Sequence, residues 1–327
     1  MSENNIKIDD VAKALGISKT TVSRSLSGKG RISEATRQKV LDYVESHNYR
    51  PNPIAKGLAN SKTYNIAWVV PANSDMNALS FFQRCLGGVI NASNEEDYDI
   101  IITTTHAYDN RRLKKLIDNR KVDGVILGQT LVDDINIKLL ADSGMPFVVI
   151  GSTNIDNVTM IDNDHSAACR ELTAVLVMKG LKRIAYIGGD STKVVNITRR
   201  DGFIKGCQGN NSMIRMDCND YKDVAVAVDE AIEKNSDCIV CEDDRICQQV
   251  LAKLEKDMIS VPEQIKIASF YNSTLLENNK PPITSLQYDP RELGKVAVNI
   301  FLKKIDNKEV PQKTILGYEV LLKGSTQ

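Results

Sequence analysis

The first 62 residues alternate short apolar stripes with turn-forming residues. Four apolar side chains recur at i, i+3, i+4 and i+7, the spacing of one helix face: Ile8, Val11, Ala12 and Leu15. This spacing predicts a short helix that ends at Gly16, since glycine tolerates the left-handed backbone found after a helix.

A second short helix is predicted directly after this turn, with Ser18 as its N-cap and with Val22 and Leu26 facing inward. Its outward side chains are small hydroxyls and cations: Lys19, Thr20, Ser23, Arg24 and Ser27. After the turn "SGKGRI", Ser33 is placed to cap a third helix in which Val40, Leu41 and Val44 face inward. Two short helices separated by a turn and braced by a third are typical of a helix-turn-helix.

The polar outer face suits the major groove of DNA. Short Ser and Thr side chains bond phosphates there, and Lys or Arg reaches guanine edges. A small helical bundle whose polar side chains meet only solvent remains an alternative.

Residues 49–63, "YRPNPIAKGLANSKT", predict a short helix from Ile54 to Asn60, with Pro53 at its first position and Asn52 as its cap. A helix of about seven residues is marginal alone in water, so it needs a partner to form. With Ala55 and Leu58 on one face and Lys56 nearby, it would place an apolar wedge in a DNA minor groove. A plain interdomain linker is the alternative.

From Thr63 onward the pattern becomes apolar strands alternating with helix-length stretches. The apolar runs are "NIAWVV", "DIIITTT", "DGVILG", "PFVVIGS", "RIAYIGG", "SDCIVC" and "IKIASFY". Such alternation predicts parallel sheets covered by helices. About 265 residues exceed what one such sheet uses, so a second subdomain is expected to begin near Met160 to Asp164, where "MIDNDHSAA" leads into a long helix.

Charge separates the two parts. Residues 1–62 carry 11 Lys plus Arg against 6 Asp plus Glu. The remainder carries 31 Lys plus Arg against 36 Asp plus Glu, so the whole chain of 327 residues has a formal net charge of +0. A basic head on an acidic body indicates a polyanionic partner for the head. No apolar run reaches membrane-span length and "MSENNIKIDD" lacks a secretion signal, so a cytoplasmic protein with no membrane partner is expected.

The residues argue against an enzyme or a metal protein. The 7 cysteines are scattered, and Cys238 and Cys241 flank Ile239 and Val240 in a strand whose alternation turns the two thiols to opposite faces. His47, His106 and His165 show no metal-ligand spacing, and Gly188 to Ser191 is better interpreted as a turn than as a phosphate loop. We therefore expect no catalytic residue, no metal and no cofactor.

At this point a family resemblance covers essentially the whole chain. The head, with "DVA", "VSR", "TR..V" and "Y.PN..A..L" in one order and spacing, closely resembles the LacI/GalR family of bacterial transcription regulators. "DGVIL", "VVIGS", "IDND", "RRDGF" and "ELG" are similar to that family's periplasmic-binding-protein-like core.

The resemblance implies an all-α helix-turn-helix head over residues 1–50, a hinge helix over 51–62, and an α/β core over 63–327 made of two doubly wound parallel-sheet subdomains. The first subdomain would span about 63–161 plus 290–318, and the second about 162–289 plus 319–327. The function implied is a repressor that binds a pseudo-palindromic operator as a homodimer and is controlled by a small molecule, a sugar or sugar derivative.

The resemblance also implies two sets of contact residues. Lys19, Thr20 and Arg24 match base-reading or groove-contacting positions, and Leu58 matches the intercalating hinge leucine. Lys56 stands where many members have arginine. The lysine keeps the positive charge, but it cannot make the bidentate contact that an arginine makes. The full expected DNA-binding set is Ser18, Lys19, Thr20, Thr21, Ser23, Arg24, Ser27, Asn52, Ala55, Lys56 and Leu58.

The expected effector-binding set is Phe81, Phe82, Asp162, Arg199, Glu242 and Tyr271. Arg199 matches a ligand-clamping arginine, against the alternative of a surface helix arginine. Phe81 and Phe82 are either an aromatic cleft rim or core residues, and Asp162 either accepts a ligand hydroxyl or is a helix N-cap.

Two positions in this effector set depart from the family pattern. Tyr271 stands where the family usually has an aspartate, with Asn272 after it, and Glu242 stands where an asparagine is common. These departures make an ordinary neutral hexose less assured as the effector.

Two other functional classes fit parts of the pattern. Control by a corepressor or protein partner in place of an inducer stays open, and a solute-binding protein fits the core but not the basic head. Since "LLKGSTQ" ends the chain without a heptad tail, a dimer is favoured over a tetramer held by a helical bundle.

Overall fold

The structure is a computed structural model that describes residues 6–28, 30–50, 52–72, 80–210 and 212–327. It divides into two compact units, Met1–Thr63 and Tyr64–Gln327. Pro51, where the expected hinge begins, lies outside the described residues. In the part of the chain that the structure describes, no helix is both long and apolar enough to cross a membrane.

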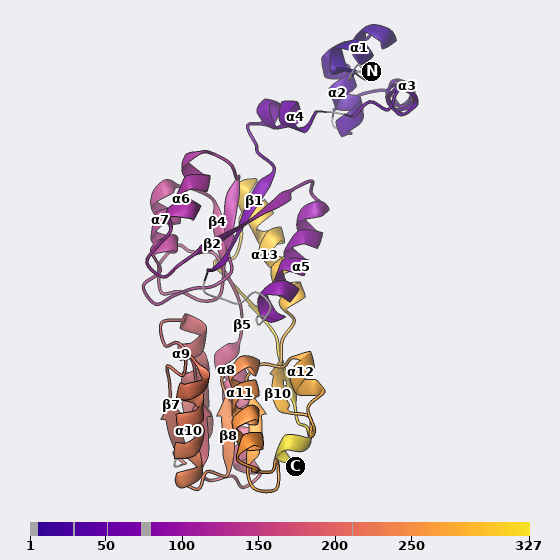
Figure 1. Ribbon diagram of the computed structural model, residues 1–327. Helices are drawn as coiled ribbons and strands as arrows, with labels where there is room; N and C mark the ends of the chain where they lie inside the picture. The colour runs from indigo at the N-terminus through magenta and orange to yellow at the C-terminus, as the bar shows by residue number, and fades with distance from the viewer. Residues whose placement is uncertain (1–5, 29, 51, 73–79, 211) are drawn as a thin grey trace. The chain divides into compact units, whose positions relative to one another are not determined.

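The first unit consists of short helices: α1 (Ile8–Leu15), α2 (Lys19–Ser27), α3 (Glu34–Ser46) and α4 (Pro53–Asn60) (Figure 1). The predicted helices are confirmed. The apolar stripes of α1, α2 and α3 pack together in one core. The buried members of this core are Val11, Ala12, Val22, Val40 and Tyr49, and Leu15, Leu26 and Val44 pack against them.

One inward prediction in α3 is wrong. Leu41 is 40% exposed, whereas Val40 is fully buried and Tyr43 and Val44 pack against the core. The reason is the helical period. Positions 40, 43 and 44 share one face, but Leu41 lies about 100° around the helix from Val40.

The second unit contains two six-stranded sheets. The first has the order β11-β5-β4-β3-β1-β2, and all its pairs are parallel. Its strands are β1 (Asn65–Pro71), β2 (Asp99–Thr105), β3 (Gly124–Leu127), β4 (Phe147–Ile150), β5 (Met160–Asn163) and β11 (Lys313–Leu316). Helices α5 (Ser80–Asn94) and α13 (Pro290–Ile305) cover one face, and α6 (Arg111–Asp118) and α7 (Ile135–Ser143) cover the other.

The second sheet has the order β12-β10-β9-β8-β6-β7, with only the β10–β12 pair antiparallel. Its strands are β6 (Ile184–Ile187), β7 (Ser212–Arg215), β8 (Cys238–Cys241), β9 (Lys266–Ser269), β10 (Thr284–Gln287) and β12 (Glu319–Leu321). Helices α8 (His165–Met178) and α9 (Val194–Cys207) cover one face, and α10 (Tyr221–Glu233) and α11 (Asp244–Lys256) cover the other (Figure 1). The short α12 (Thr274–Glu277) and the 3-10 turn η1 (Gly324–Thr326) complete this half.

The alternation predicted for the buried strands is confirmed. In β8, Cys238 and Val240 pack on the α8–α9 side of the sheet, and Ile239 and Cys241 pack on the α10–α11 side. All seven cysteines are buried, so they fill the core as small apolar side chains. The fold class expected from the resemblance, a helix-turn-helix head on a core of two parallel-sheet halves, is confirmed.

Two glycines let α5 and α13 approach each other closely. A Cβ on Gly88 would lie 1.9 Å from the Arg291 carbonyl oxygen, and one on Gly294 would lie 2.2 Å from the Cys85 carbonyl oxygen. No side chain fits at either point. Gly294 belongs to the "ELG" motif, so that motif has a packing role in the first half of the second unit.

Candidate functional site

The first candidate site is the exposed face of α2. Gly16 ends α1 in the left-handed conformation at φ 65, and Ser18 begins the next helix. The Ser18 Oγ accepts a hydrogen bond from the Thr21 backbone N–H at 3.1 Å and lies 2.9 Å from the Thr21 hydroxyl. These hydrogen bonds form the cap, which fixes the point where α2 starts.

The side chains predicted to face outward from α2 are exposed: Lys19, Thr20, Ser23, Arg24 and Ser27. Lys19 Nζ lies 2.5 Å from an Asp9 carboxylate oxygen. This exposed pair contributes little stability and leaves the ammonium within reach of another anion. The face therefore offers two cations and three hydroxyl side chains, a combination that matches phosphates and base edges.

The second candidate element is α4, which begins at Pro53 as predicted. The Asn52 Oδ1 accepts a hydrogen bond from the Ala55 N–H at 3.4 Å, in agreement with its predicted role as the cap. Ala55, Lys56 and Leu58 are exposed, and the Leu58 side chain has 82% of its surface in solvent. A leucine this exposed adds nothing to the core of its unit, so its apolar surface is free for an external partner.

The third candidate site lies in the second unit, where several strands end. Both sheets contain the strand order 2-1-3-4-5 of doubly wound folds, read as β2-β1-β3-β4-β5 and β7-β6-β8-β9-β10. Ligands of such sheets bind outside the carboxyl ends of the strands, where the order reverses. In the second sheet this point lies between β6 and β8.

Arg199 of α9 and Glu242, directly after β8, meet at this point. Arg199 is 8% exposed, so the alternative of a surface arginine is wrong. One guanidinium nitrogen, Nη1, donates to the Glu242 backbone carbonyl at 3.2 Å, and Nε has no hydrogen-bond partner among the described residues.

The Glu242 carboxylate is held within the protein. It accepts hydrogen bonds from the Tyr186 hydroxyl at 2.9 Å and from the Gly189 N–H at 2.8 Å, and it is fully buried. Burial, reinforced by neighbouring Asp243, raises the pKa of Glu242 to about 7. Both carboxylate oxygens are engaged, so Glu242 supports the loop at Gly189 and the position of Arg199.

Asp162 lies at the end of β5 and is buried. The N-cap of α8 is Asp164, whose carboxylate accepts from the Ala167 N–H at 3.0 Å, so the cap interpretation of Asp162 is wrong. The Asp162 carboxylate accepts from the Ser152 hydroxyl at 2.7 Å and the Asn163 N–H at 2.8 Å, and it lies 3.4 Å from His165 Nε2. Burial raises the pKa of this carboxyl, but His165 and the other donors outweigh it and hold the pKa below its ordinary value.

Aromatic rings line the same region. Tyr271 is buried, its ring centroid lies 6.3 Å from that of Phe81, and it stacks on Tyr288 at 6.3 Å. Phe81 is half-buried and packs against the cores of both halves of the unit. Phe82 is buried in the core of the first half, as expected if it is a core residue and not part of a cleft rim.

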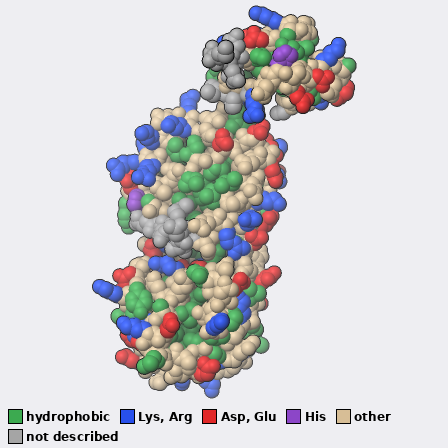
Figure 2. Space-filling model, turned by 45° about the vertical axis from the view of Figure 1, so that its right-hand side comes forward, with side chains coloured by type: hydrophobic (Ala, Val, Ile, Leu, Met, Phe, Trp, Pro, Cys, Tyr) green, Lys and Arg blue, Asp and Glu red, His purple; other side chains and the backbone are tan. Residues whose placement is uncertain are grey.

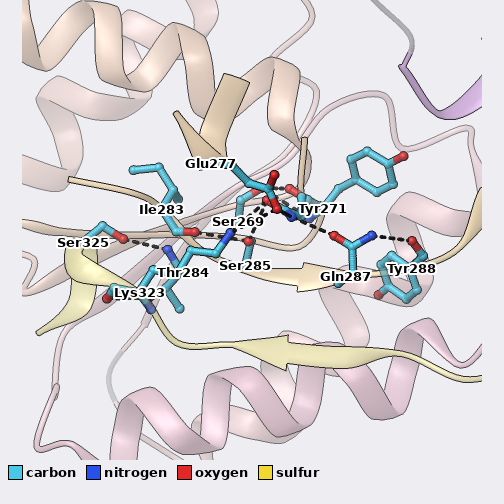
Figure 3. A network of polar contacts seen from close by, with 11 residues as sticks. Ser269, Tyr271, Glu277, Ile283, Thr284, Ser285, Gln287, Tyr288, Lys323 and Ser325 are labelled. Atoms are coloured by element: carbon cyan, nitrogen blue, oxygen red, sulfur yellow. Dashed lines mark hydrogen bonds and ion pairs between the residues drawn. The ribbon is translucent and has the colours of Figure 1, made fainter. Parts of the chain in front are cut away.

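Asn272, beside Tyr271 in the chain, is the centre of a saturated polar network. Figure 3 shows its partners Glu277, Ser285, Gln287 and Lys323 around it. Its Nδ2 donates to Glu277 and Gln287, both at 2.7 Å, and its Oδ1 accepts from the Ser285 hydroxyl and the Lys323 ammonium. All hydrogen-bonding capacity of Asn272 is used within the protein. The network therefore fixes the loop that carries Tyr271.

Sequence reasoning missed three further buried polar residues at this site: Asn163, His165 and Tyr288. His165 and Tyr288 pack ring against ring at 4.8 Å. Among the described residues, His165 Nδ1, both amide atoms of Asn163 and the Tyr288 hydroxyl have no hydrogen-bond partner. Asn163 ends β5, while His165 and Tyr288 closely follow β5 and β10. Those two strands were not predicted from the sequence. The expectation that ligands bind at the carboxyl ends of parallel strands therefore could not point to these three residues.

Comparison with known proteins agrees with the fold, a helix-turn-helix and a core of two parallel-sheet halves. The family model of the bacterial regulatory proteins of the lacI family matches residues 7–52, and that of the periplasmic binding protein-like domain matches residues 173–326. Catabolite control protein A of Staphylococcus aureus is 26% identical over 333 residues, which cover 98% of this chain and 99% of that protein.

Two solved structures show the same fold. The probable maltose operon transcriptional repressor malR of Staphylococcus aureus has 25% sequence identity and a TM-score of 0.76, covering 81% of this chain and 99% of that one. The lac repressor dimer bound to operator and an anti-inducer has 19% identity, a likeness in fold alone, with a TM-score of 0.82 over 99% of each chain.

Proposed function

This chain is a member of the lacI family of bacterial regulatory proteins, and from that premise we propose that it is an operator-binding repressor controlled by a small carbohydrate-like effector. The observation that carries the proposal is the first unit, a folded helix-turn-helix whose second helix keeps its hydroxyls and cations in solvent. The function of the second unit is then to sense the effector and to pair two chains.

On DNA, α2 would lie in the major groove, where Lys19, Thr20 and Arg24 reach base edges and Ser18, Thr21, Ser23 and Ser27 meet phosphates or sugars. The α4 helix, with Asn52, Ala55 and Lys56 along the backbone, would insert Leu58 into the minor groove and open a base step. The exposed Leu58 side chain supports this role, since no other described residue covers it.

A homodimer fits a pseudo-palindromic operator, because two-fold symmetry in the protein matches two half-sites in the DNA. Apolar side chains lie exposed on one face of the first-sheet half of the second unit (Figure 2). Ile90 of α5 and Ile102 of β2 are among the exposed large apolar side chains of this half, at 38% and 49% of their surface. We propose that chains pair through such apolar surface.

The effector would bind between the two sheet halves, with Arg199 as its clamp, Phe81 and Tyr271 against its ring face, and Asp162 accepting from it. Glu242 would act by holding Arg199 in place, and Phe82 by supporting Phe81 from the core. The names of the relatives, a catabolite control protein and a maltose operon repressor, support a carbohydrate-like effector. Backbone hydrogen bonds join the halves beside this region, from Val132 N–H to the Thr192 oxygen and from Val194 N–H to the Thr130 oxygen.

A change in these inter-half contacts is the proposed route from effector to DNA. If the effector prefers one arrangement of the two halves, it shifts the population toward that arrangement. A coupling of about 1–3 kcal/mol would change operator affinity by about 5- to 150-fold. No step of this scheme requires an enzyme activity, and it places the protein in the cytoplasm with the chromosome.

The test is selection of genomic DNA fragments by the purified full chain at near-physiological salt, followed by sequencing of what is retained. We expect enrichment of one palindromic sequence. A chain lacking residues 1–62 serves as the control and should retain nothing above background. Absence of enrichment, both alone and with added cell metabolites, would contradict the regulator. Enrichment only with metabolites would support the alternative of a corepressor.

A further inference from the structure

Residues 111–121, "RRLKKLIDNRK", form a basic patch on the second unit. They comprise α6 and the turn that follows it, and they include 6 Lys plus Arg against 1 Asp. The second unit as a whole is acidic, with 31 Lys plus Arg against 36 Asp plus Glu over residues 63–327. Cations that cluster in one place on an acidic body indicate a polyanionic partner at that place.

Three cations of the basic patch are engaged within the protein: Arg111 with the Asp109 carboxylate, Lys114 with the Asp118 carboxylate, and Arg112 with the Thr104 hydroxyl. The other three are exposed: Lys115, Arg120 and Lys121. Among the residues that the structure describes, none of these three side chains forms an ion pair or a hydrogen bond. They therefore carry three charges that the fold itself does not neutralise.

The backbone holds these cations in place at the end of α6. Arg120 adopts the left-handed conformation at φ 48. Its N–H and that of Lys121 donate to carbonyl groups of the last turn of α6, at 2.9 and 3.0 Å, which closes the helix. Lys115 and Lys121 line one groove along the edge strand β2, so their side chains lie on the same side of the unit.

The turn after α6 lies at the end of the second unit where the head is joined. The Asn65 side chain, at the start of β1, donates to the Lys121 carbonyl at 3.1 Å. Asn65 follows Asn60, the last residue of α4, by five residues, which span at most about 18 Å when fully extended. If α4 lies in a minor groove, as proposed above, this turn is tethered close to the phosphates beside that groove.

Resting on the function proposed above, we infer that the second unit makes its own contact with the operator, in which Lys115, Arg120 and Lys121 bind phosphates that flank the minor-groove site of α4. Contacts with phosphates carry no sequence information, so this contact adds affinity without changing which operator is read. The head remains the main source of DNA affinity, because it carries the base-reading side chains and the larger share of the interface.

The first test measures the operator affinity of the full chain as a function of salt concentration, by fluorescence anisotropy, with the operator found in the fragment selection above. The α6 variant is Lys115→Gln/Arg120→Gln/Lys121→Gln. The matched control changes three exposed lysines at the C-terminal ends of α8, α10 and α11: Lys179→Gln/Lys234→Gln/Lys256→Gln. Both variants lose three charges near helix C-termini, where cations interact favourably with the helix dipole, so they differ in where those charges lie.

The expected result is a smaller salt dependence in the α6 variant. Each phosphate contact contributes about 0.9 to the slope of log affinity against log salt. With about one to three contacts from each chain of the proposed homodimer, the slope should be smaller by about 2–5 than that of the wild type. Between about 50 and 200 mM salt, the wild type should therefore lose at least about tenfold more affinity than the α6 variant. The control should keep the wild-type slope.

The second test locates the contact on the DNA. Operator duplexes carry one neutral methylphosphonate in place of a single phosphate, at each position in turn beside the central base step. We expect some of these duplexes to bind the wild type and the control about 2- to 5-fold more weakly than the unmodified operator does. The α6 variant should bind the same duplexes as well as it binds the unmodified operator.

Equal salt slopes in the α6 variant and the wild type, or equal sensitivity to every methylphosphonate, would overturn the inference. The regulator would then stand, with DNA bound by the head alone. If the wild type itself binds no operator, both proposals fail. Thermal midpoints are measured for all proteins. If the α6 variant does not fold, Lys121→Gln carries the comparison, with a slope smaller by about 2, and Lys121→Arg, which keeps the charge, should retain the wild-type slope.

Discussion

Glu242 shows how a single buried side chain links the site to pH. It is fully buried, and two hydrogen bonds stabilise its carboxylate, yet burial still raises its pKa to about 7. An ordinary glutamate in the unfolded chain titrates near 4.5. The folded protein therefore binds this proton more tightly than the unfolded chain does, so the contribution of Glu242 to stability decreases as pH rises from about 4.5 to about 7.

The prediction is that Glu242→Gln removes this pH dependence. Glutamine is similar in size and keeps an oxygen for the Gly189 N–H, but it carries no charge. Relative to the wild type, the variant should gain about 2 kcal/mol in free energy of unfolding between pH 5 and pH 8. Urea denaturation at both pH values measures the difference. A gain that is equal at the two pH values would show that Glu242 does not titrate in this range.

At the scale of elements, α4 has a polar N-cap and an apolar side chain that packs against no core. Asn52 fixes where the helix begins, while Leu58 is 82% exposed and leaves the core of its unit unaffected. A helix this short is marginal alone in water, and in the proposed complex a DNA groove would supply the apolar surface that covers Leu58.

We predict that Leu58→Ala weakens operator affinity by about 10- to 100-fold, the value of burying one leucine side chain. The thermal midpoint of the protein should not change, because no packing is lost. Leu41→Ala is the matched control, since Leu41 is also an exposed leucine of the first unit, at 40% of its surface. Operator affinity by fluorescence anisotropy and the midpoint by calorimetry give the two readings. A similar loss of affinity in both variants would argue against insertion of Leu58.

At the scale of the whole molecule, the distribution of charge matters more than its sum. Residues 1–62 carry 11 Lys plus Arg against 6 Asp plus Glu, while the chain as a whole has a formal net charge of +0. The acidic remainder forms the larger compact unit, which has its own cores on both faces of two sheets. DNA affinity is therefore expected to come from the head, and folding of the body is expected to be independent of the head.

Operator affinity should fall linearly with salt on a log–log scale, with a slope of about −0.9 for each phosphate that the protein neutralises. The effector affinity of a chain lacking residues 1–62 should match that of the full chain, because the proposed effector site lies within the second unit. Titrations of DNA and effector at several salt concentrations test both statements. A salt-independent operator affinity would contradict a phosphate-based interface.

The amino-acid sequence by itself determined the elements that local rules decide. The head helices follow from apolar spacing and from caps at Ser18, Ser33 and Asn52, all of which involve residues within a few positions of one another. The seven apolar runs became strands because each is long or apolar enough to demand burial. The inward orientation predicted for Leu41 was wrong because the spacing of apolar residues does not decide whether a residue at the edge of an apolar helix face is buried.

The tertiary structure alone decided the remaining strands and the site. The missed strands β5, β7, β10, β11 and β12 are three or four residues long and contain polar side chains, so only their pairing partners make them strands. The site joins residues far apart in the chain, such as Tyr186 with Glu242 and Arg199 with the Glu242 carbonyl. Which buried donors find an acceptor depends on which side chains the fold brings near them. For that reason the burial of Arg199 and its hydrogen bond to the Glu242 carbonyl could not be predicted from the sequence.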